Sequence, residues 1–319
     1  MGDTGEVRCC VCNLPIQGEA SRLGGRFYDK AHYSRVSLEN RAAARPIFVL
    51  IVALASITGL VYFSTLLFPA GSTAITGLPF RIAATLLAIL PAGIWLIAFY
   101  RLDRLEPEPK EYVLGVFVLG AVLAVGIGQP FIDRVFQLEE WQHQSAWITM
   151  LGAILCVGFV QEFLKYAAVR YTVFRSAEFD ERVDGIIYAA AAGLGYATAL
   201  NLTYVSNISA LAVGAGAAKM AVQALGHATY AGIMGSFLSK ARFELTPRWW
   251  LPVGLTLASV LNGVVTTLLL QVGTFHTTIR DSAIHHWLRL GLAALIALGI
   301  YFVLFRAIRK LNAERLAQD

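Results

Sequence analysis

The chain has 319 residues, of which 57% are hydrophobic and 15% are charged, and its mean hydropathy is +0.61. An ordinary soluble domain is excluded, because the apolar residues concentrate in blocks of about 20–26, long enough to cross a bilayer. The formal net charge of +5 is explained by basic residues facing anionic lipid, so we expect a lipid bilayer and no nucleic acid as partner. The composition predicts an all-α, polytopic membrane protein.

Eight transmembrane helices are predicted in chain order. Each is long enough to cross about 30 Å of hydrocarbon at 1.5 Å per residue. The predicted spans are residues 47–69, 79–100, 111–136, 146–174, 183–206, 217–239, 249–273 and 285–308. The first span is expected to be an anchor, because the preceding residues are polar and no signal-peptide cleavage site is visible.

The distribution of basic residues predicts the orientation of these spans. Of the 26 Lys and Arg residues, 20 lie in segments that one topology places on the same side of the membrane: 1–46, 101–110, 170–182, 240–248 and 306–319. Because basic loops stay in the cytoplasm, both termini are predicted to be cytoplasmic. The protein is then multi-pass in the plasma (inner) membrane.

Residues 1–45 are predicted to form a small cytoplasmic module, and residues 46–319 the membrane domain. Cytoplasmic thiols stay reduced, so a Cys-x2-Cys pair there indicates metal binding or redox chemistry. The pair Cys9 and Cys12, a Gly-Gly turn and the pair Asp29 and His32 resemble the first half of a LIM-type zinc module. Zinc accepts all four ligand types, which predicts a structural zinc in a zinc-ribbon or treble-clef-like module. The alternative is a solvated tail with a reactive cysteine cluster.

Polar side chains occur inside the central predicted spans, where each costs several kcal/mol and persists mainly at a functional site. These residues are Gln161, Glu162 and Lys165 in FVQEFLKY, Asn201, His227 and Asn262. Glu162, His227 and Asn262 lie 13, 13 and 14 residues from the basic residues that end their spans, which is a depth of about 20 Å for each. A shared depth predicts that they line one cavity.

A carboxylate, an imidazole and amides at one depth suit hydrolysis of a peptide bond. The carboxylate can take a proton from water, the histidine can assist it or protonate the leaving amine, and an asparagine such as Asn201 or Asn262 can stabilise the oxyanion. The residues therefore indicate a peptidase that needs no catalytic cofactor.

Four strings resemble the PrsW family of intramembrane proteases in order and spacing: RLDRLEPEPK at 101–110, FVQEFLKY, FDERVDGIIYAAAAGLGYA and ALGHATYAGIMGSF. The resemblance covers about residues 90–270. It implies a polytopic helical fold and the cleavage of membrane-anchored regulators such as anti-sigma factors. It is compatible with either a metal-free glutamic or a metal-dependent mechanism.

The resemblance assigns roles residue by residue. The family's Glu-Glu-x-x-Lys motif falls on Gln161, Glu162 and Lys165, and its mid-membrane histidine falls on His227. A Phe-x-x-x-Glu motif followed by Asn falls on Tyr196, Leu200 and Asn201, and Asn262 stands where many members carry a further histidine.

Three departures from the family pattern bear on the mechanism, because Gln161 and Leu200 each replace a carboxylate and Asn262 replaces a histidine. A catalytic zinc needs about three protein ligands, so these losses favour a glutamate-and-histidine mechanism of the kind used by the related CAAX prenyl endopeptidases. Gln161 cannot accept a proton at neutral pH. The chain as written is then either a pseudoenzyme or an inactive form of an enzyme with glutamate at this position.

Two other classes of function fit some of the same features. A non-catalytic receptor or scaffold could bind a single-pass partner in the same cavity. A transporter also uses polar residues at the midplane, but no inverted repeat of broken helices is visible. The favoured prediction is an intramembrane endopeptidase that cleaves membrane-anchored proteins.

Overall fold

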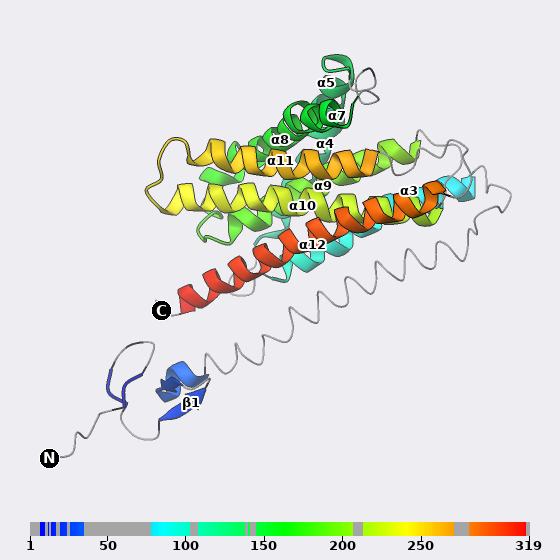
Figure 1. Cartoon of the computed structure of the whole chain (residues 1–319). Helices are drawn as coiled ribbons and strands as arrows, with labels where there is room; N and C mark the ends of the chain where they lie inside the picture. The colour runs from blue at the N-terminus through cyan, green and yellow to red at the C-terminus, as the bar shows by residue number, and fades with distance from the viewer. Residues whose placement is uncertain are drawn as a thin grey trace.

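The structure is a computed structural model, and it describes residues 7–9, 12, 14–16, 20–23, 26–34, 78–102, 108–137, 140, 145–206, 213–270 and 281–316. Apart from a small amino-terminal module, the described chain is helical (Figure 1). The predicted boundary between residues 45 and 46 lies outside the described residues and stays a prediction.

The helical part is a bundle of long helices. Its elements are α3 (Leu78–Tyr100), α4 (Lys110–Leu123), η1 (Ala124–Gly128), α5 (Gln129–Arg134), α7 (Ala146–Gly152), η2 (Ala153–Gly158), α8 (Phe159–Arg170), η3 (Val173–Arg175), α9 (Asp184–Ser206), α10 (Val213–Phe243), α11 (Trp250–Leu270) and α12 (Asp281–Leu316). In Figure 1, α10 and α11 run side by side and α12 crosses the bundle at a slant.

In the part of the chain that the structure describes, six helices are long and apolar enough to cross a membrane: Arg81–Tyr100, Lys110–Arg134, Trp147–Arg175, Asp184–Ser206, Trp250–Leu269 and Leu290–Leu311. They confirm six of the eight predicted spans and a multi-pass membrane protein. The predicted span 217–239 is helical, within α10, but Gln223, His227 and several glycines make it less apolar than the other six. The predicted span 47–69 lies outside the described residues.

Helix α9 is the centre of the bundle, since it packs against α3, α4, α8 and α10. Nearly all of its side chains are buried. Its small residues make this possible, because they let neighbouring helix backbones approach closely. At Gly193, an added Cβ would collide with the main-chain carbonyl of His227 on α10. The backbones of α9 and α10 are thus in close contact at the predicted catalytic histidine, as they also are where Gly235 meets Gly185.

Two of the described membrane helices contain a π-helical segment within their length. Segment η1 joins α4 to α5, and η2 joins α7 to α8, so each pair forms one continuous membrane-length helix. π turns are rare and often lie at functional sites. Here η2 immediately precedes the FVQEFLKY string of α8.

The amino-terminal module contains a short two-stranded antiparallel sheet. Strands β1 (Ser21–Leu23) and β2 (Arg26–Tyr28) pair with Arg22 opposite Phe27, and one helical turn follows at residues 30–34. Before the hairpin, the Cys9 amide donates to the Leu14 carbonyl at 2.9 Å, which folds the chain into a tight loop around the first cysteines. This order of loop, hairpin and helix agrees with the predicted treble-clef-like module.

Candidate active site

A buried ion pair lies at the centre of the bundle. Glu162 and Lys165 are three residues apart on α8, and their side chains form a salt bridge. Both are almost fully buried. The Lys165 Nζ also lies 3.0 Å from Nδ1 of His227 on α10. A charged lysine can only donate, so the ammonium connects the carboxylate of one helix to the imidazole of another.

Asn262 brings α11 into the same cluster. Its Nδ2 donates to Glu162 Oε1 at 2.7 Å and to Gln161 Oε1 at 3.0 Å. Its Oδ1 accepts from the Thr266 hydroxyl at 3.0 Å, which fixes the orientation of the amide. Both amide hydrogens of Asn262 are therefore donated to acceptors within the protein.

Close helix packing places Asn262 at this position. A Cβ added at Gly263 would collide with the backbone of Ile154 in η2. Because the two backbones almost touch, the short side chain of Asn262 reaches the first turn of α8. The sequence signal for this contact is the Asn-Gly pair in an otherwise apolar helix.

A cavity of about 300 Å³ opens beside this cluster. Its wall includes Gln161, His227, Tyr230 and Asn262, whereas Glu162 is not part of the wall and lies behind Gln161. Residues 162, 227 and 262 thus meet in one cluster, but the prediction that all three line the cavity is wrong for Glu162. The side chain that faces the cavity from the FVQEFLKY string is Gln161.

Aromatic rings hold the imidazole of His227 in place. Tyr196 of α9 stacks on it with ring centroids 5.7 Å apart, and Tyr230, one turn along α10, contacts it edge-on at 6.4 Å. Among the described residues, the buried hydroxyl of Tyr230 has no hydrogen-bond partner. Tyr230 was not predicted as a site residue, although its spacing of three residues from His227 places it on the same helix face.

Asn201 lies apart from the cluster. Its Nδ2 donates to the main-chain carbonyls of Ala88 in α3 and Met220 in α10, at 3.4 and 3.2 Å. It therefore ties α9 to two neighbouring helices. Its neighbour Leu200, which stands where the family pattern has a carboxylate, lines the cavity.

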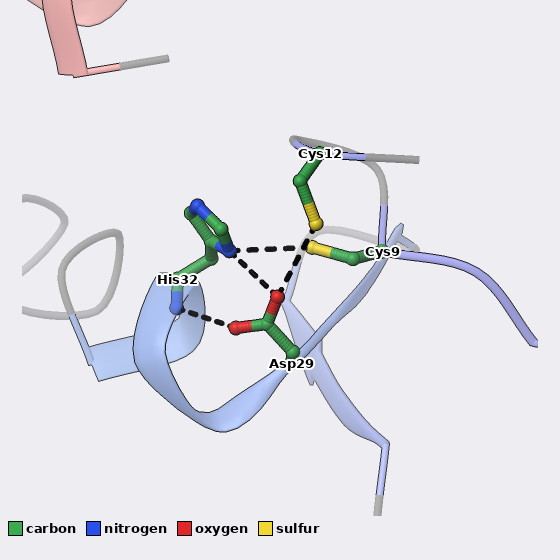
Figure 2. A group of neighbouring side chains, drawn as sticks. All are labelled: Cys9, Cys12, Asp29 and His32. Atoms are coloured by element: carbon green, nitrogen blue, oxygen red, sulfur yellow. Dashed lines mark hydrogen bonds and ion pairs between the residues drawn. The ribbon is translucent and has the colours of Figure 1, made fainter. Parts of the chain in front are cut away.

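Cys9, Cys12, Asp29 and His32 converge in the amino-terminal module (Figure 2), with one ligand atom from each within 4.8 Å of the others. Cys9 Sγ lies 3.7 Å from His32 Nδ1, and Cys12 Sγ lies 3.5 Å from Asp29 Oδ2. Two ligands of one tetrahedral zinc are about 3.5 Å apart when one is sulfur. The group could therefore hold a metal ion.

Hydrogen bonds keep Asp29 ready to act as a ligand. The His32 backbone N–H donates to Oδ1 at 2.8 Å, and the His32 ring lies 2.6 Å from Oδ2. These two contacts hold the pKa of the Asp29 carboxyl well below its usual range. Metal binding by this group requires the ring of His32 and Oδ2 to move apart to about 3.3 Å.

Comparison with known proteins identifies the family. The sequence profile described as "PrsW family intramembrane metalloprotease" matches residues 108–305. The chain belongs to the PrsW family of intramembrane proteases. Protease PrsW of Bacillus subtilis (strain 168) is 36% identical over 187 residues, which cover 55% of this chain and 80% of that protein. Protease PrsW of Geobacillus kaustophilus (strain HTA426) is 34% identical over 183 residues, which cover 57% and 77%. No solved structure matches the chain.

The family description names a metalloprotease, but the donor set of this chain does not fit a catalytic metal. Only Glu162 and His227 offer strong ligand atoms in the cluster, and a catalytic zinc needs about three. Lys165 hydrogen-bonds both of them, so a cation between them would face a fixed ammonium. In the described part of the chain, the one convergent group of three or more His, Cys, Asp or Glu side chains is the amino-terminal group.

Proposed function

We propose that this PrsW-family chain binds a membrane-anchored protein in the cavity beside Gln161 and His227, and that a glutamate at position 161 makes this site a metal-free peptidase. The observation that carries the proposal is the cavity wall. Gln161, His227, Tyr230 and Asn262 face one buried space, and the Glu162–Lys165 pair lies directly behind them. A peptide bond in this space would meet groups able to move protons and to stabilise charge.

The lysine sets the tautomer of His227. Because the Lys165 ammonium donates to Nδ1, a neutral imidazole carries its proton on Nε2. The N–H at Nε2 and the Tyr230 hydroxyl then donate to the developing oxyanion in this proposal, since both Nδ2 hydrogens of Asn262 are used. Asn262 instead positions the side chains at 161 and 162.

Position 161 carries the general base in this proposal. A glutamate there would face the cavity, and Asn262 would hold it in place as it holds Gln161. It would take a proton from the attacking water and pass it to the leaving amine, while the Nε2–H of His227 hydrogen-bonds the oxyanion. With Gln161 the chain keeps the binding site and loses the base, so the present form acts as a receptor for the same partner.

The test compares membranes of cells that express the chain as written, the Gln161→Glu variant, and Gln161→Glu with His227→Ala. The membrane proteins of the host serve as substrates, and mass spectrometry of protein amino termini detects where they are cleaved. We expect new termini in or beside transmembrane segments only with Gln161→Glu. A general base is worth about 10²–10⁴ in rate, so the difference will be plain. Equal cleavage by the unmodified chain, or no new termini with Gln161→Glu, rejects the chemistry.

The proposal places the protein in the plasma (inner) membrane with both termini in the cytoplasm and single-pass regulators, such as anti-sigma-factor-like proteins, as substrates. The basic segments support this orientation. In a chain without its native cysteines, Glu140→Cys should react with an impermeant maleimide added outside the cell, whereas Ser176→Cys should not. The opposite labelling pattern would show that the topology is the reverse of the one proposed.

A structural zinc in the amino-terminal module completes the proposal. Its ligands are Cys9, Cys12, Asp29 and His32, and the distances between their donor atoms support it. The zinc has no part in catalysis, because it stabilises only the small module.

A further inference from the structure

A lysine lies in the wall of the same cavity. Among the described residues that line it, Lys219 of α10 is the only one with a formal charge. It is partly buried and shares the wall with polar Gln129, Thr203 and Gln223. An ionisable residue inside a membrane helix is costly and usually marks a functional site.

The position of Lys219 is fixed relative to the reaction centre. Residues 219, 223 and 227 follow at intervals of four along α10, so they share one face of the helix. The ammonium lies 4.5 Å from the centre of the Tyr204 ring of α9, a contact that holds a cation against an aromatic face. The same two helices, α9 and α10, therefore form the wall around both the lysine and the imidazole.

The spacing sets the distance between the two groups. Eight residues of α-helix put Lys219 about 12 Å along the axis from His227. An extended peptide advances about 3.3 Å per residue. We propose that Lys219 is a subsite for a carboxylate side chain of the substrate, three to five residues from the bond placed at His227. This inference rests on the proposed function, because it takes the cavity to hold a peptide.

A substrate carboxylate fits this position better than a lipid phosphate. The subsite belongs to a cavity of about 300 Å³ that also contains the reaction centre. A peptide extending from His227 passes Lys219, whereas a phospholipid would have to place its headgroup in the same space and exclude that peptide. Lys219 also lies toward the end of α10 that is predicted to be outside the cytoplasm. The predicted substrate thus carries Asp or Glu in the half of its bound segment that lies toward the outside of the cell.

A cleavage profile tests the subsite without a known substrate. In the Gln161→Glu background, amino-terminal mass spectrometry should show Asp or Glu enriched at one position, three to five residues from the cleaved bonds. Adding Lys219→Glu should remove this enrichment and favour Lys or Arg there. The matched control is Lys240→Glu on the same helix, outside the cavity, where the lysine pairs with Glu244 at 3.8 Å; it should leave the profile unchanged. An identical profile for Lys219→Glu and its parent rejects the subsite.

A binding experiment keeps the inference testable if no cleavage occurs. The chain as written receives a photoreactive group at cavity residue Leu200 and is reconstituted in phosphatidylcholine vesicles, with or without phosphatidylglycerol. The probes are synthetic single-pass peptides that carry Asp, Asn or Lys at the favoured distance. Close charge pairs across interfaces couple strongly, so Lys219→Glu should lower crosslinking of the Asp peptide about tenfold and raise that of the Lys peptide.

The crosslinking outcomes separate the two proposals. A charge swap without any cleavage by Gln161→Glu supports the subsite and rejects the proposed chemistry. Equal crosslinking of all three peptides rejects the subsite, as does no crosslinking at all. If the effect of Lys219→Glu on crosslinking depends on phosphatidylglycerol and not on whether the peptide carries Asp, Asn or Lys, then Lys219 binds lipid headgroups and the subsite is rejected. Because the Lys peptide should bind Lys219→Glu better than the parent, a misfolded variant is recognised at once.

Discussion

At the scale of single residues, the position of Lys165 decides what its neighbours can do. The ammonium contacts both Glu162 and Nδ1 of His227, so it balances the buried carboxylate and leaves Nε2 of the imidazole for the cavity. Breaking a buried pair by removing one partner is strongly destabilising, because it leaves an uncompensated charge. Lys165 is thus a positioning residue for both Glu162 and His227.

Tyr230 gives a prediction at this scale. In the Gln161→Glu background, Tyr230→Phe should lower kcat about 10²-fold or more with little change in KM, because loss of one oxyanion donor has this effect. The rate is measured on a peptide that spans a cleavage site found with the parent. Tyr301→Phe is the matched control, since Tyr301 is a buried tyrosine on α12 whose hydroxyl has no partner among the described residues and lies outside the cavity wall. Equal losses of kcat in both variants would show that Tyr230 contributes to packing and not to oxyanion stabilisation.

At the scale of helices, the site depends on how closely the backbones approach. Asn262 reaches α8 because Gly263 lies against Ile154, and His227 is held where α9 crosses α10 at Gly193. Small residues at such crossings are the usual means by which membrane helices pack. The cluster therefore depends on close helix packing at Gly193 and Gly263, although neither glycine has a reactive side chain.

Gly193 tests this dependence. Gly193→Ala should destabilise the bundle by about 1–3 kcal/mol, because overpacking forces backbones apart, and it should reduce cleavage by the Gln161→Glu form. Gly299→Ala on α12 is the same substitution in a helix, with nothing within 4 Å of the added methyl. This control should be neutral or stabilising by up to about 1 kcal/mol. Thermal unfolding in detergent measures both, and equal midpoints would contradict the close crossing.

At the scale of the whole molecule, the membrane bundle and the amino-terminal module carry separate chemistries. We expect one zinc per chain in purified protein, lost with Cys12→Ser and retained with Cys156→Ser, since Cys156 lies in η2 of the bundle. Elemental analysis measures the content. A chelator should remove this zinc and leave cleavage by the Gln161→Glu form unchanged. Cleavage that stops with the chelator and resumes with added zinc would show a metal-dependent reaction.

The sequence allowed the height of each polar residue in the membrane to be predicted, but not the direction of its side chain. Glu162, His227 and Asn262 were placed at one depth by counting residues, and they meet in the structure. Asn201 was expected to be able to stabilise the oxyanion, yet its side chain binds the backbones of α3 and α10. Counting along a helix gives the rise and not the rotation, which also explains why Tyr230 and Lys219 were missed.

The order of the helices was predictable, whereas the π-helical segments were not. Apolar length alone located the six spans seen in the structure. An extra residue in one turn leaves the apolar run unbroken, so nothing in residues 146–174 predicts a change of helix type at η2. The rotation of α8 that turns Gln161 toward the cavity and Glu162 behind it depends on this turn.

Because of the π turn at η2, the continuous helix formed by α7, η2 and α8 can lose one residue at this place without a rotation of the residues that follow. Removing a residue from an α-helix turns everything beyond it by about 100°, but a π turn already contains one residue more than an α turn. Deletion of Leu155, whose side chain is 66% exposed, would convert η2 into α-helix and leave Gln161 facing the cavity. A one-residue deletion between η2 and Gln161 would instead rotate the site away from α11. A one-residue deletion that preserves the site is therefore expected within residues 153–158.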